Sequence, residues 1–219
     1  MTSSVTVVIP SYPRGLVGRA IASVQAQTVP CRMLVTESPK DDWWNAKIND
    51  AVASTSTEWI AILCDDDELC PTFVEEMLAA SEGVDLVMCA RRIVNPTDPI
   101  LAAWFRVTSH IEVAHPLTVE SMVRGCPCAM TCLIRRSAWD ALGGYRGAMT
   151  YSDWDFSIRF AAQGLPWRII PQPLWLYHEH TTNGALVLDH DAALLQLQAA
   201  HPQLPWLAKD EPRPIEQVA

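Results

Sequence analysis

The sequence predicts a single α/β domain in which a mixed β-sheet lies between two layers of helices. Over residues 5–90, short β-branched runs alternate with segments whose apolar residues repeat at helical spacing, a pattern typical of parallel strands covered on both faces. Beyond Arg91 the alternation becomes irregular, which predicts a mixed second half. Apolar residues make up 49% and charged residues 19% of the 219 positions, enough apolar residues for a sizeable core.

The N-terminal half is expected to consist of β-α units. Residues 5–9 form a β-branched run that Pro10 ends, and residues 16–27 place apolar side chains at helical spacing. The other expected strands cover residues 33–36, 59–64 and 84–90. The helices between them have an inner face of Trp44, Ile48, Ala51 and Val52 in one case and begin at Pro71 in the other.

In the C-terminal half, strands are expected over residues 101–108, 129–135, 167–170 and 175–178, with short helices between them. A helix is expected to begin at residues 152–155 and to end at Gly164. From His201 the chain is rich in proline and loses its apolar rhythm. We therefore expect one domain over residues 1–200 and an irregular tail over residues 201–219.

Charge and composition exclude several classes of protein. With 16 basic and 25 acidic residues the net charge is -9, which disfavours a surface that binds nucleic acid without sequence preference. No apolar stretch approaches the roughly 18 residues of a membrane span, and the N-terminus has no basic leader. We expect a cytoplasmic protein without a membrane span. The odd number of cysteines, 7, predicts reduced thiols, and a zinc site at Cys126, Cys128 and Cys132 is disfavoured because no fourth ligand is evident.

An acidic cluster directly follows the strand expected at residues 59–64. It consists of Asp65, Asp66, Asp67 and Glu68, at the carboxyl end of a strand, where open α/β sheets bind ligands. Two unit charges 4 Å apart repel by about 4 kcal/mol at an effective dielectric constant of about 20, so the cluster requires solvent, protonation or a cation. A hard divalent cation suits these oxygen ligands. The alternative is a solvated acidic turn before the helix near Pro71.

Further sequence segments carry a family resemblance. In the N-terminal half they are VTVVIPSYPR (5–14), AIASVQAQT (20–28), AKINDAV (46–52) and EWIAILCDDDELCP (58–71). In the C-terminal half they are RRSAWDALGGY (135–145) and SDWDFSIRFAAQG (152–164). Together these segments resemble family 2 glycosyltransferases of the GT-A fold. The resemblance implies a Rossmann-type three-layer sandwich with a nucleotide-sugar half at about residues 1–95 and an acceptor half at about residues 96–200.

The same resemblance implies an activity and a metal. Such enzymes transfer a sugar from a nucleotide diphosphate to a hydroxyl acceptor, usually with inversion and with Mn2+ or Mg2+ as cofactor. The family's acidic motif, Asp-x-Asp-Asp, reads here from Cys64 to Asp67, with Cys64 in place of the first acid. The implied metal ligands are Asp66, Asp67 and His180, and Asp65 is expected near the ribose.

The resemblance also implies contacts with the donor, for which a UDP-sugar is expected. Tyr12 would stack on the base, Glu37 would accept hydrogen bonds from the base or ribose, and the pair Lys47 and Asn49 would lie near the diphosphate. Taken alone, Lys47 fits a solvated helix face better. The implied donor-binding residues are Pro10, Ser11, Tyr12, Arg14, Glu37, Lys47, Asn49 and Asp65. Pro13 and Ser38 stand where the family commonly has asparagine and a second aspartate.

Asp153 is the expected general base on the acceptor side. Ser152 and Asp155 match a capping box for the helix that begins there. Asp153 then lies in the first turn, where the helix dipole is expected to hold it ionised, until expulsion of solvent by substrate raises its pKa. The resemblance gives Asp153 the role of accepting the proton of the attacking hydroxyl. Trp154 is a candidate acceptor contact through its flat ring.

Several assignments stay open at this stage. Trp44 is expected in the core, Trp43 is undecided and His178 has no assigned role. The acceptor could be a glycan, a lipid, a protein or a modified nucleobase. A catalytically inert nucleotide-sugar-binding domain is one alternative function, suggested by the departures at Cys64, Ser38 and Ser152. A sugar-phosphate nucleotidyltransferase is another, although residues 10–15 match its Gly-rich basic loop poorly.

Overall fold

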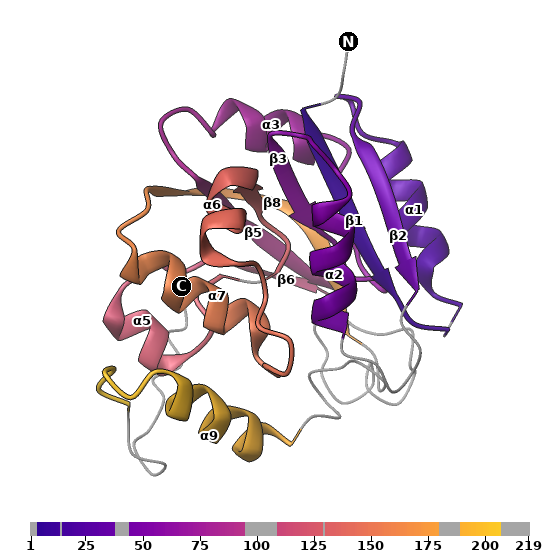
Figure 1. Ribbon diagram of the computed structural model, residues 1–219. Coiled ribbons are helices and arrows are strands. Elements are labelled where there is room, and N and C mark those ends of the chain that lie inside the picture. The colour runs from indigo at the N-terminus through magenta and orange to yellow at the C-terminus, as the bar shows by residue number, and fades with distance from the viewer. Residues whose placement is uncertain are drawn as a thin grey trace.

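The computed structural model describes residues 4–13, 15–37, 44–94, 109–128, 130–179 and 189–206. Its strands are β1 (Val5–Ser11), β2 (Arg32–Glu37), β3 (Trp59–Ile62), β4 (Glu68–Leu69), β5 (Leu86–Val94), β6 (Ser109–Glu112), β7 (Leu133–Arg135) and β8 (Trp167–His178). They form an 8-stranded sheet in the order β2-β1-β3-β7-β5-β8-β4, with β6 paired to β5. Helices cover both faces of this mixed sheet (Figure 1), as the predicted fold class requires.

The N-terminal half of the sheet is parallel. β1 is buried along its whole length because it pairs with β2 on one side and β3 on the other. The register matches Ser11 with Glu37 and Val8 with Ile62. The carboxyl ends of these three strands therefore meet at one edge of the sheet, and the loops that follow them are neighbours.

The C-terminal half of the sheet is mixed, as predicted. β7 is antiparallel to both β3 and β5, whereas β8 runs parallel to β5. Residues 167–170 and 175–178, predicted as separate strands, are one strand, because β8 continues to pair with β5 across a register shift between Cys89 and Arg91. The strand predicted over 129–135 is shortened to β7. The strand predicted over 101–108 lies outside the described residues.

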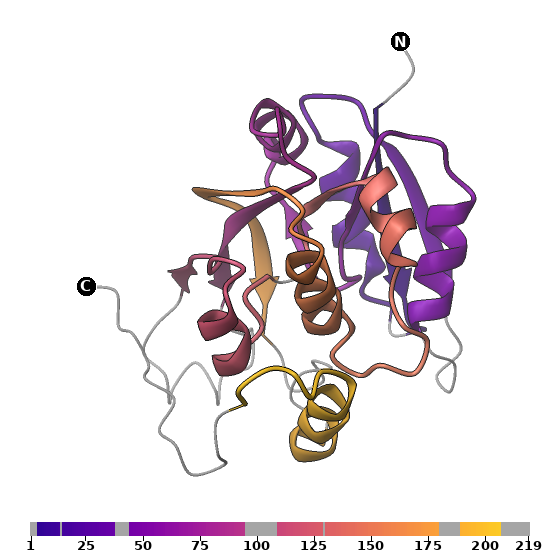
Figure 2. The same ribbon diagram turned by 60° about the vertical axis from the view of Figure 1, so that its left-hand side comes forward.

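Two helical layers enclose two cores. On one face, α1 (Val17–Gln25) and α3 (Phe73–Ala79) pack against the sheet, and on the other face lie α2 (Trp44–Ala53), α6 (Arg136–Leu142) and α7 (Ser152–Ala162) (Figures 1 and 2). Alternation along β1 supplies both cores, with Val7 and Ile9 in one and Val8 in the other. Trp44 packs against the α2 side core, in agreement with its prediction.

The second layer is completed by α5 (Val119–Arg124) and α9 (His190–Ala200). In the described part of the chain, every helix is too short or too polar to cross a bilayer.

Asp155 of α7 joins three segments of the C-terminal half. Its carboxylate is fully buried and accepts hydrogen bonds from Arg146 Nη1 (3.1 Å), Arg159 Nε (2.8 Å) and His201 Nε2 (2.8 Å). The capping box predicted for Ser152 and Asp155 is therefore wrong, because Asp155 points to the two arginines and His201 and not to the helix start. Within the described residues, the Ser152 hydroxyl is buried without a hydrogen-bond partner.

The segment predicted as a tail begins inside the domain. His201 is buried against Asp155, and the ring of Trp206 meets the ring of Trp154 edge-on with centroids 6.2 Å apart. Residues 201–206 thus pack on α7, since a buried carboxylate and an apolar ring hold them there.

Candidate metal and nucleotide-sugar site

The acidic cluster lies in the loop between β3 and β4 and is buried. Asp65, Asp66 and Asp67 are 1%, 6% and 1% exposed, so the alternative of a solvated acidic turn is wrong. Carboxylate oxygens of Asp66 and Asp67 lie with the Cys64 sulfur in a group whose atoms are all within 4.8 Å of one another. Buried carboxylates this close need protons, hydrogen-bond donors or a cation.

Asp65 joins this loop to the loop after β1. Its Oδ2 accepts a hydrogen bond from the Tyr12 backbone N–H at 2.9 Å and one from the Ser11 hydroxyl at 3.4 Å. These contacts follow from the parallel pairing of β1 and β3, which carries both loops to the same edge. Ser11, Tyr12 and Asp65 are thus brought together, as the sequence analysis expected of the donor contacts.

Asp67 joins the acidic loop to β8. Its Oδ1 accepts a hydrogen bond from the His178 backbone N–H at 3.0 Å. Burial, and to a lesser degree the neighbouring charge of Asp66, raises the pKa of Asp67 well above its usual value, although that hydrogen bond and the charges of Arg91 and Arg19 act in the opposite direction. A second negative charge at this site is therefore unfavourable, and a bound cation would offset the repulsion between the two carboxylates.

Arg19 and His178 contact each other and the acidic loop, an arrangement that was not predicted from the sequence. Arg19 donates to the Asp66 backbone oxygen at 3.2 Å and lies 3.2 Å from His178 Nδ1. Because a guanidinium can only donate, Nδ1 accepts and the proton of the ring is on Nε2, which lies 2.7 Å from Glu68 Oε1. Burial lowers the pKa of His178, which agrees with a neutral ring. No local sequence pattern indicated this contact, because Arg19 lies in α1 and His178 at the end of β8.

The donor set at this edge fits a hard divalent cation. Burial and the charge of Asp67 raise the pKa of the Cys64 thiol well above its usual value, and a protonated sulfur is a poor ligand for Mg2+ or Mn2+. The oxygen ligands of the group are Asp66 and Asp67, whose mutual repulsion a cation would offset. His180, the third predicted ligand, lies outside the described residues.

Two of the remaining predicted donor residues, Pro10 and Glu37, lie near the carboxyl ends of β1 and β2. Pro10 is buried in β1, and Glu37 is exposed at the end of the edge strand β2, opposite Ser11. Lys47 is half-buried on α2. Arg14, the departure at Ser38 and the undecided Trp43 lie outside the described residues.

Asn49 is not available to a donor in this structure, which corrects its predicted role. Its Nδ2 donates to the Tyr145 backbone oxygen at 2.7 Å, and its Oδ1 accepts from the Tyr145 backbone N–H at 3.0 Å. The Asn49 amide therefore pairs both backbone groups of Tyr145, which follows a turn in which Gly143 and Gly144 have positive φ. The physical reason is that α2 packs beside α6. The Asn49 amide therefore contacts the backbone that follows α6 and not the edge of the sheet.

Asp153 lies at the start of α7, within electrostatic range of Cys64. Its charge contributes to the raised pKa values of Cys64, Cys126 and Tyr145. Burial raises the pKa of Asp153 itself, despite a hydrogen bond from the Trp154 N–H to its Oδ1 at 2.8 Å. The expectation that the helix dipole holds this carboxyl at a low pKa is therefore wrong, because loss of water outweighs the dipole before any substrate binds.

Trp154 belongs to the core and not to a substrate surface. It is 6% exposed, its Nε1 donates to the Met122 backbone oxygen at 2.8 Å, and its ring contacts those of Tyr151 and Trp206. The predicted acceptor contact is wrong, because α5 and the residues after α9 cover the ring.

Arg91 of β5 is a second functional candidate that the sequence analysis missed. It donates to Glu112 Oε2 from Nε (2.6 Å) and Nη2 (2.5 Å), and its guanidinium carbon lies 4.7 Å and 5.6 Å from the ring centres of Tyr177 and Trp175. Its positive charge lowers the pKa values of both Asp67 and Asp153. Two adjacent arginines, Arg91 and Arg92, inside an otherwise apolar strand sequence were the available signal.

Among the described residues, no second group of potential metal ligands forms around the cysteines. No disulfide joins any of the cysteines, all of which the structure describes. Across the described ranges, Cys126, Cys128 and Cys132 belong to no group of three or more potential ligands like that of Cys64, Asp66 and Asp67. Burial raises the pKa of Cys126 well above the usual thiol value, and a hydrogen bond with the Cys132 side chain, followed by burial, does the same for Cys128. They are reduced thiols, as predicted.

Comparison with known proteins identifies the fold. The sequence matches no protein family and no curated protein. Solved structures do match. Residues 1–349 of S. aureus TarS in complex with UDP-GlcNAc match with a TM-score of 0.66 and 11% identity, over 89% of this chain and 65% of that one. The mannosyltransferase PcManGT from Pyrobaculum calidifontis, in complex with GDP-Man and Mn2+, matches with a TM-score of 0.64 and 15% identity over 96% of this chain and 66% of that one.

These likenesses show that the chain has the GT-A-like fold of the matched glycosyltransferases. A longer TarS structure matches over 81% of this chain but only 37% of its own length, with a TM-score of 0.61. The chain thus spans less than two thirds of the length of these solved neighbours.

Proposed function

We propose that the protein is a metal-assisted, inverting glycosyltransferase that moves a sugar from a nucleotide-diphosphate donor to a hydroxyl acceptor. The observation that supports this proposal is the presence, in a GT-A-like fold, of two different carboxylate environments that act on each other's surroundings. One is the buried loop with Asp66 and Asp67, and the other is Asp153, which acts electrostatically on the same loop through Cys64. Solved neighbours in complex with UDP-GlcNAc or GDP-Man share the fold.

The donor would lie across the ends of β1, β2 and β3. Asp65, which Tyr12 and Ser11 already fix in position, would accept hydrogen bonds from the ribose. Tyr12 would stack on the base, with Pro10, Arg14 and Glu37 around it and Lys47 near the diphosphate. A UDP-sugar is the proposed donor class, and a GDP-sugar is the first alternative to test.

Asp66 and Asp67 would hold the cation, Mn2+ or Mg2+, with His180 as a further ligand. A cation bound there supplies positive charge that stabilises the diphosphate as it leaves. Asp67 would remain oriented by the His178 N–H, and Arg19 would hold the loop backbone through the Asp66 carbonyl. These contacts fix the Asp67 carboxylate and the loop backbone at Asp66 before a donor binds, so less ordering is required on binding.

Asp153 would act as the general base. The acceptor hydroxyl attacks the anomeric carbon from the side opposite the diphosphate, its proton passes to Asp153, and the bond between the anomeric carbon and the phosphate oxygen breaks. The configuration at that carbon is thereby inverted. Burial raises the pKa of Asp153, and a carboxylate with a raised pKa is a stronger base at neutral pH than an ordinary aspartate.

An inert nucleotide-sugar-binding domain is the second candidate. The observation that favours it is Cys64, a protonated thiol inside the ligand group where the resemblance implies an acid. Such a domain would bind the nucleotide and cation without turnover.

The test is a screen of UDP- and GDP-sugars for release of the nucleoside diphosphate, with Mn2+, with Mg2+ and with a chelator. We expect release with the metals only, and a loss of about 10³-fold in Asp66→Asn, the size expected when a group that stabilises developing charge is removed. Asp140→Asn, at an exposed residue of α6, is the matched control. Calorimetric binding of nucleotide without any release would favour the inert domain, and no binding at all would reject both candidates.

A further inference from the structure

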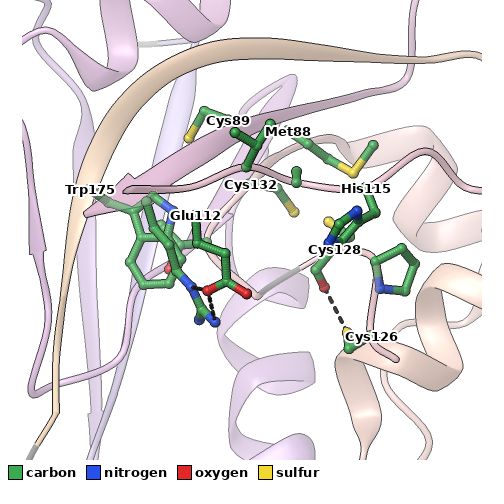
Figure 3. Close-up of a pocket in the computed structure, with 13 residues that line it drawn as sticks. Met88, Cys89, Glu112, His115, Cys126, Cys128, Cys132 and Trp175 are labelled. Atoms are coloured by element: carbon green, nitrogen blue, oxygen red, sulfur yellow. Dashed lines mark hydrogen bonds and ion pairs between the residues drawn. The ribbon is translucent and has the colours of Figure 1, made fainter. Parts of the chain in front are cut away.

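A cavity on the acceptor side of the site is not explained by donor binding. It has a volume of about 40 Å³, is partly open to solvent, and is lined by β5, the end of β6 and the residues after it, the segment that leads into β7, and Trp175 of β8 (Figure 3). A volume of this size admits only a few non-hydrogen atoms. A small group of a larger molecule fits it, and a whole sugar ring does not.

The wall of the cavity contains a buried hydroxyl group. Thr131 lines the cavity and is 3% exposed. Its Oγ1 has no hydrogen-bond partner in the part of the chain that the structure describes. Leaving a buried hydroxyl unpaired is unfavourable. A polar atom that entered the cavity would pair with this hydroxyl after rotation to a neighbouring staggered rotamer.

Cys126 connects the cavity to the proposed base. Its sulfur lines the cavity and donates to the Cys128 backbone oxygen at 3.0 Å (Figure 3). The same thiol is within hydrogen-bonding reach of the Asp153 carboxylate. A molecule anchored in the cavity therefore places its adjoining atoms near Asp153.

The charges around the cavity favour an uncharged ligand. Arg91 lines it, but the guanidinium is already paired with Glu112 through both Nε and Nη2. His115 is an exposed residue of the lining, and the rest of the wall is mainly thiol, thioether and indole. Asp153 and Glu112 add negative charge nearby. An acceptor that put a carboxylate or phosphate here would meet these charges without an unpaired arginine in the lining.

Resting on the proposed function, we infer that this cavity is an acceptor subsite that receives the hydroxymethyl group of a neutral sugar. The hydroxymethyl oxygen pairs with Thr131, its carbon contacts the sulfur atoms and Trp175, and a neighbouring ring hydroxyl faces Asp153. The substrate class is thus an uncharged hexoside, and the cavity discriminates at its exocyclic carbon.

Acceptor-stimulated release of nucleoside diphosphate, with the donor found in the screen above, tests this inference. The probes are methyl glucoside and methyl galactoside, the matching pentosides methyl xyloside and methyl arabinoside, which lack the hydroxymethyl group, and methyl glucuronide, which replaces it with a carboxylate. We expect at least one hexoside to stimulate release at about tenfold lower concentration than its pentoside, and no stimulation by the glucuronide. Thr131→Val should raise the KM for that hexoside about tenfold and leave the pentoside unchanged.

Two controls keep the outcome interpretable. Thr28→Val, at an exposed threonine that bonds to Glu75, should behave as the unchanged protein. Thr131→Val should not lower the melting temperature, since no partner in the described chain loses a hydrogen bond. Equal use of hexosides and pentosides, stimulation by the glucuronide, stimulation by none of the probes, or a Thr131→Val variant with unchanged discrimination would overturn the inference while donor turnover stands. Absence of all donor turnover would instead reject the proposed function, and this inference with it.

Discussion

The two halves of the molecule present carboxylates whose pKa values are raised for different physical reasons. In the N-terminal half, Asp67 is buried and also faces Asp66, so like charge adds to desolvation. In the C-terminal half, the upward shift of Asp153 comes from burial, and the other groups that act on it lower its pKa. A cation between Asp66 and Asp67 would therefore restore the charge of Asp67 but would change Asp153 much less.

This difference shows how one domain keeps a cation-binding acid and a proton-accepting acid distinct. The charged form of Asp67 would be stabilised by a cation in contact with it. The pKa of Asp153 is raised by exclusion of water, and the charge of Arg91, which is paired with Glu112, lowers it from further away. The same side-chain type thus serves two roles because its surroundings differ. Four substitutions test this contrast.

Asp153→Asn should have the largest effect. Transfer to an acceptor should fall about 10³-fold because the amide cannot accept the proton, whereas the affinity for nucleoside diphosphate with Mn2+ should change less than about twofold. Transfer assays and calorimetry give the two numbers, with Asp140→Asn as the control. Full transfer activity in Asp153→Asn would show that Asp153 is not the base and that the two halves do not differ in this way.

Asn49→Ala should affect stability and not the donor. The amide makes two hydrogen bonds to the Tyr145 backbone, so its loss should lower the free energy of unfolding by about 2 kcal/mol. Denaturant unfolding measures this, and Asp50→Ala, at the exposed neighbour on α2, is the control. Weaker nucleotide binding at unchanged stability would return Asn49 to the donor site.

Asp67→Asn should stabilise the metal-free protein by about 1 kcal/mol at neutral pH, a size common for substitutions that relieve functional sites. Because the pKa of Asp67 is raised in the folded protein, its contribution to stability is greatest below the ordinary carboxyl value of about 4 and declines as pH rises through the folded value. The variant should flatten this decline. Mn2+ should raise the melting temperature of the unchanged protein but not of the variant, and equal stabilisation of both would contradict the assigned ligand.

Arg91→Gln should have the smallest effect and should act on Asp153. Because Arg91 lowers the pKa of Asp153, its removal should raise that pKa further and move the acidic limb of the kcat/KM profile to higher pH. Below the limb the rate should fall about threefold, since less of the base is ionised. Arg91→Lys, which keeps the charge, should restore the profile, and Arg92→Gln, at the exposed next residue, should leave it unchanged. A profile that does not move would show that the two carboxylate environments are independent of Arg91.

The sequence carried the information for the fold and for the acidic loop. Strand and helix periodicity in the N-terminal half predicted β1 to β3 and the helices between them, because each element has a local hydrophobic pattern. The position of Asp65 to Asp67 after a buried strand was sufficient to place them at the carboxyl edge of a parallel sheet. The single strand β8 was read as two because its bulge is visible only against β5.

The properties of the side chains depended on tertiary contacts. Asp155 was given a role from local spacing, Asn49 from the family resemblance and Trp154 from its flat ring. Contacts with Arg146, Tyr145 and Met122, which lie in other segments, decide what these three side chains do. The raised pKa of Asp153 likewise follows from burial, which no local pattern reports. Sequence by itself determined where the strands end and which acids follow them, because periodicity and turn chemistry are local. Only the packed structure decided which acids are desolvated and which residues surround them, because burial and charge pairing join residues that are distant along the chain.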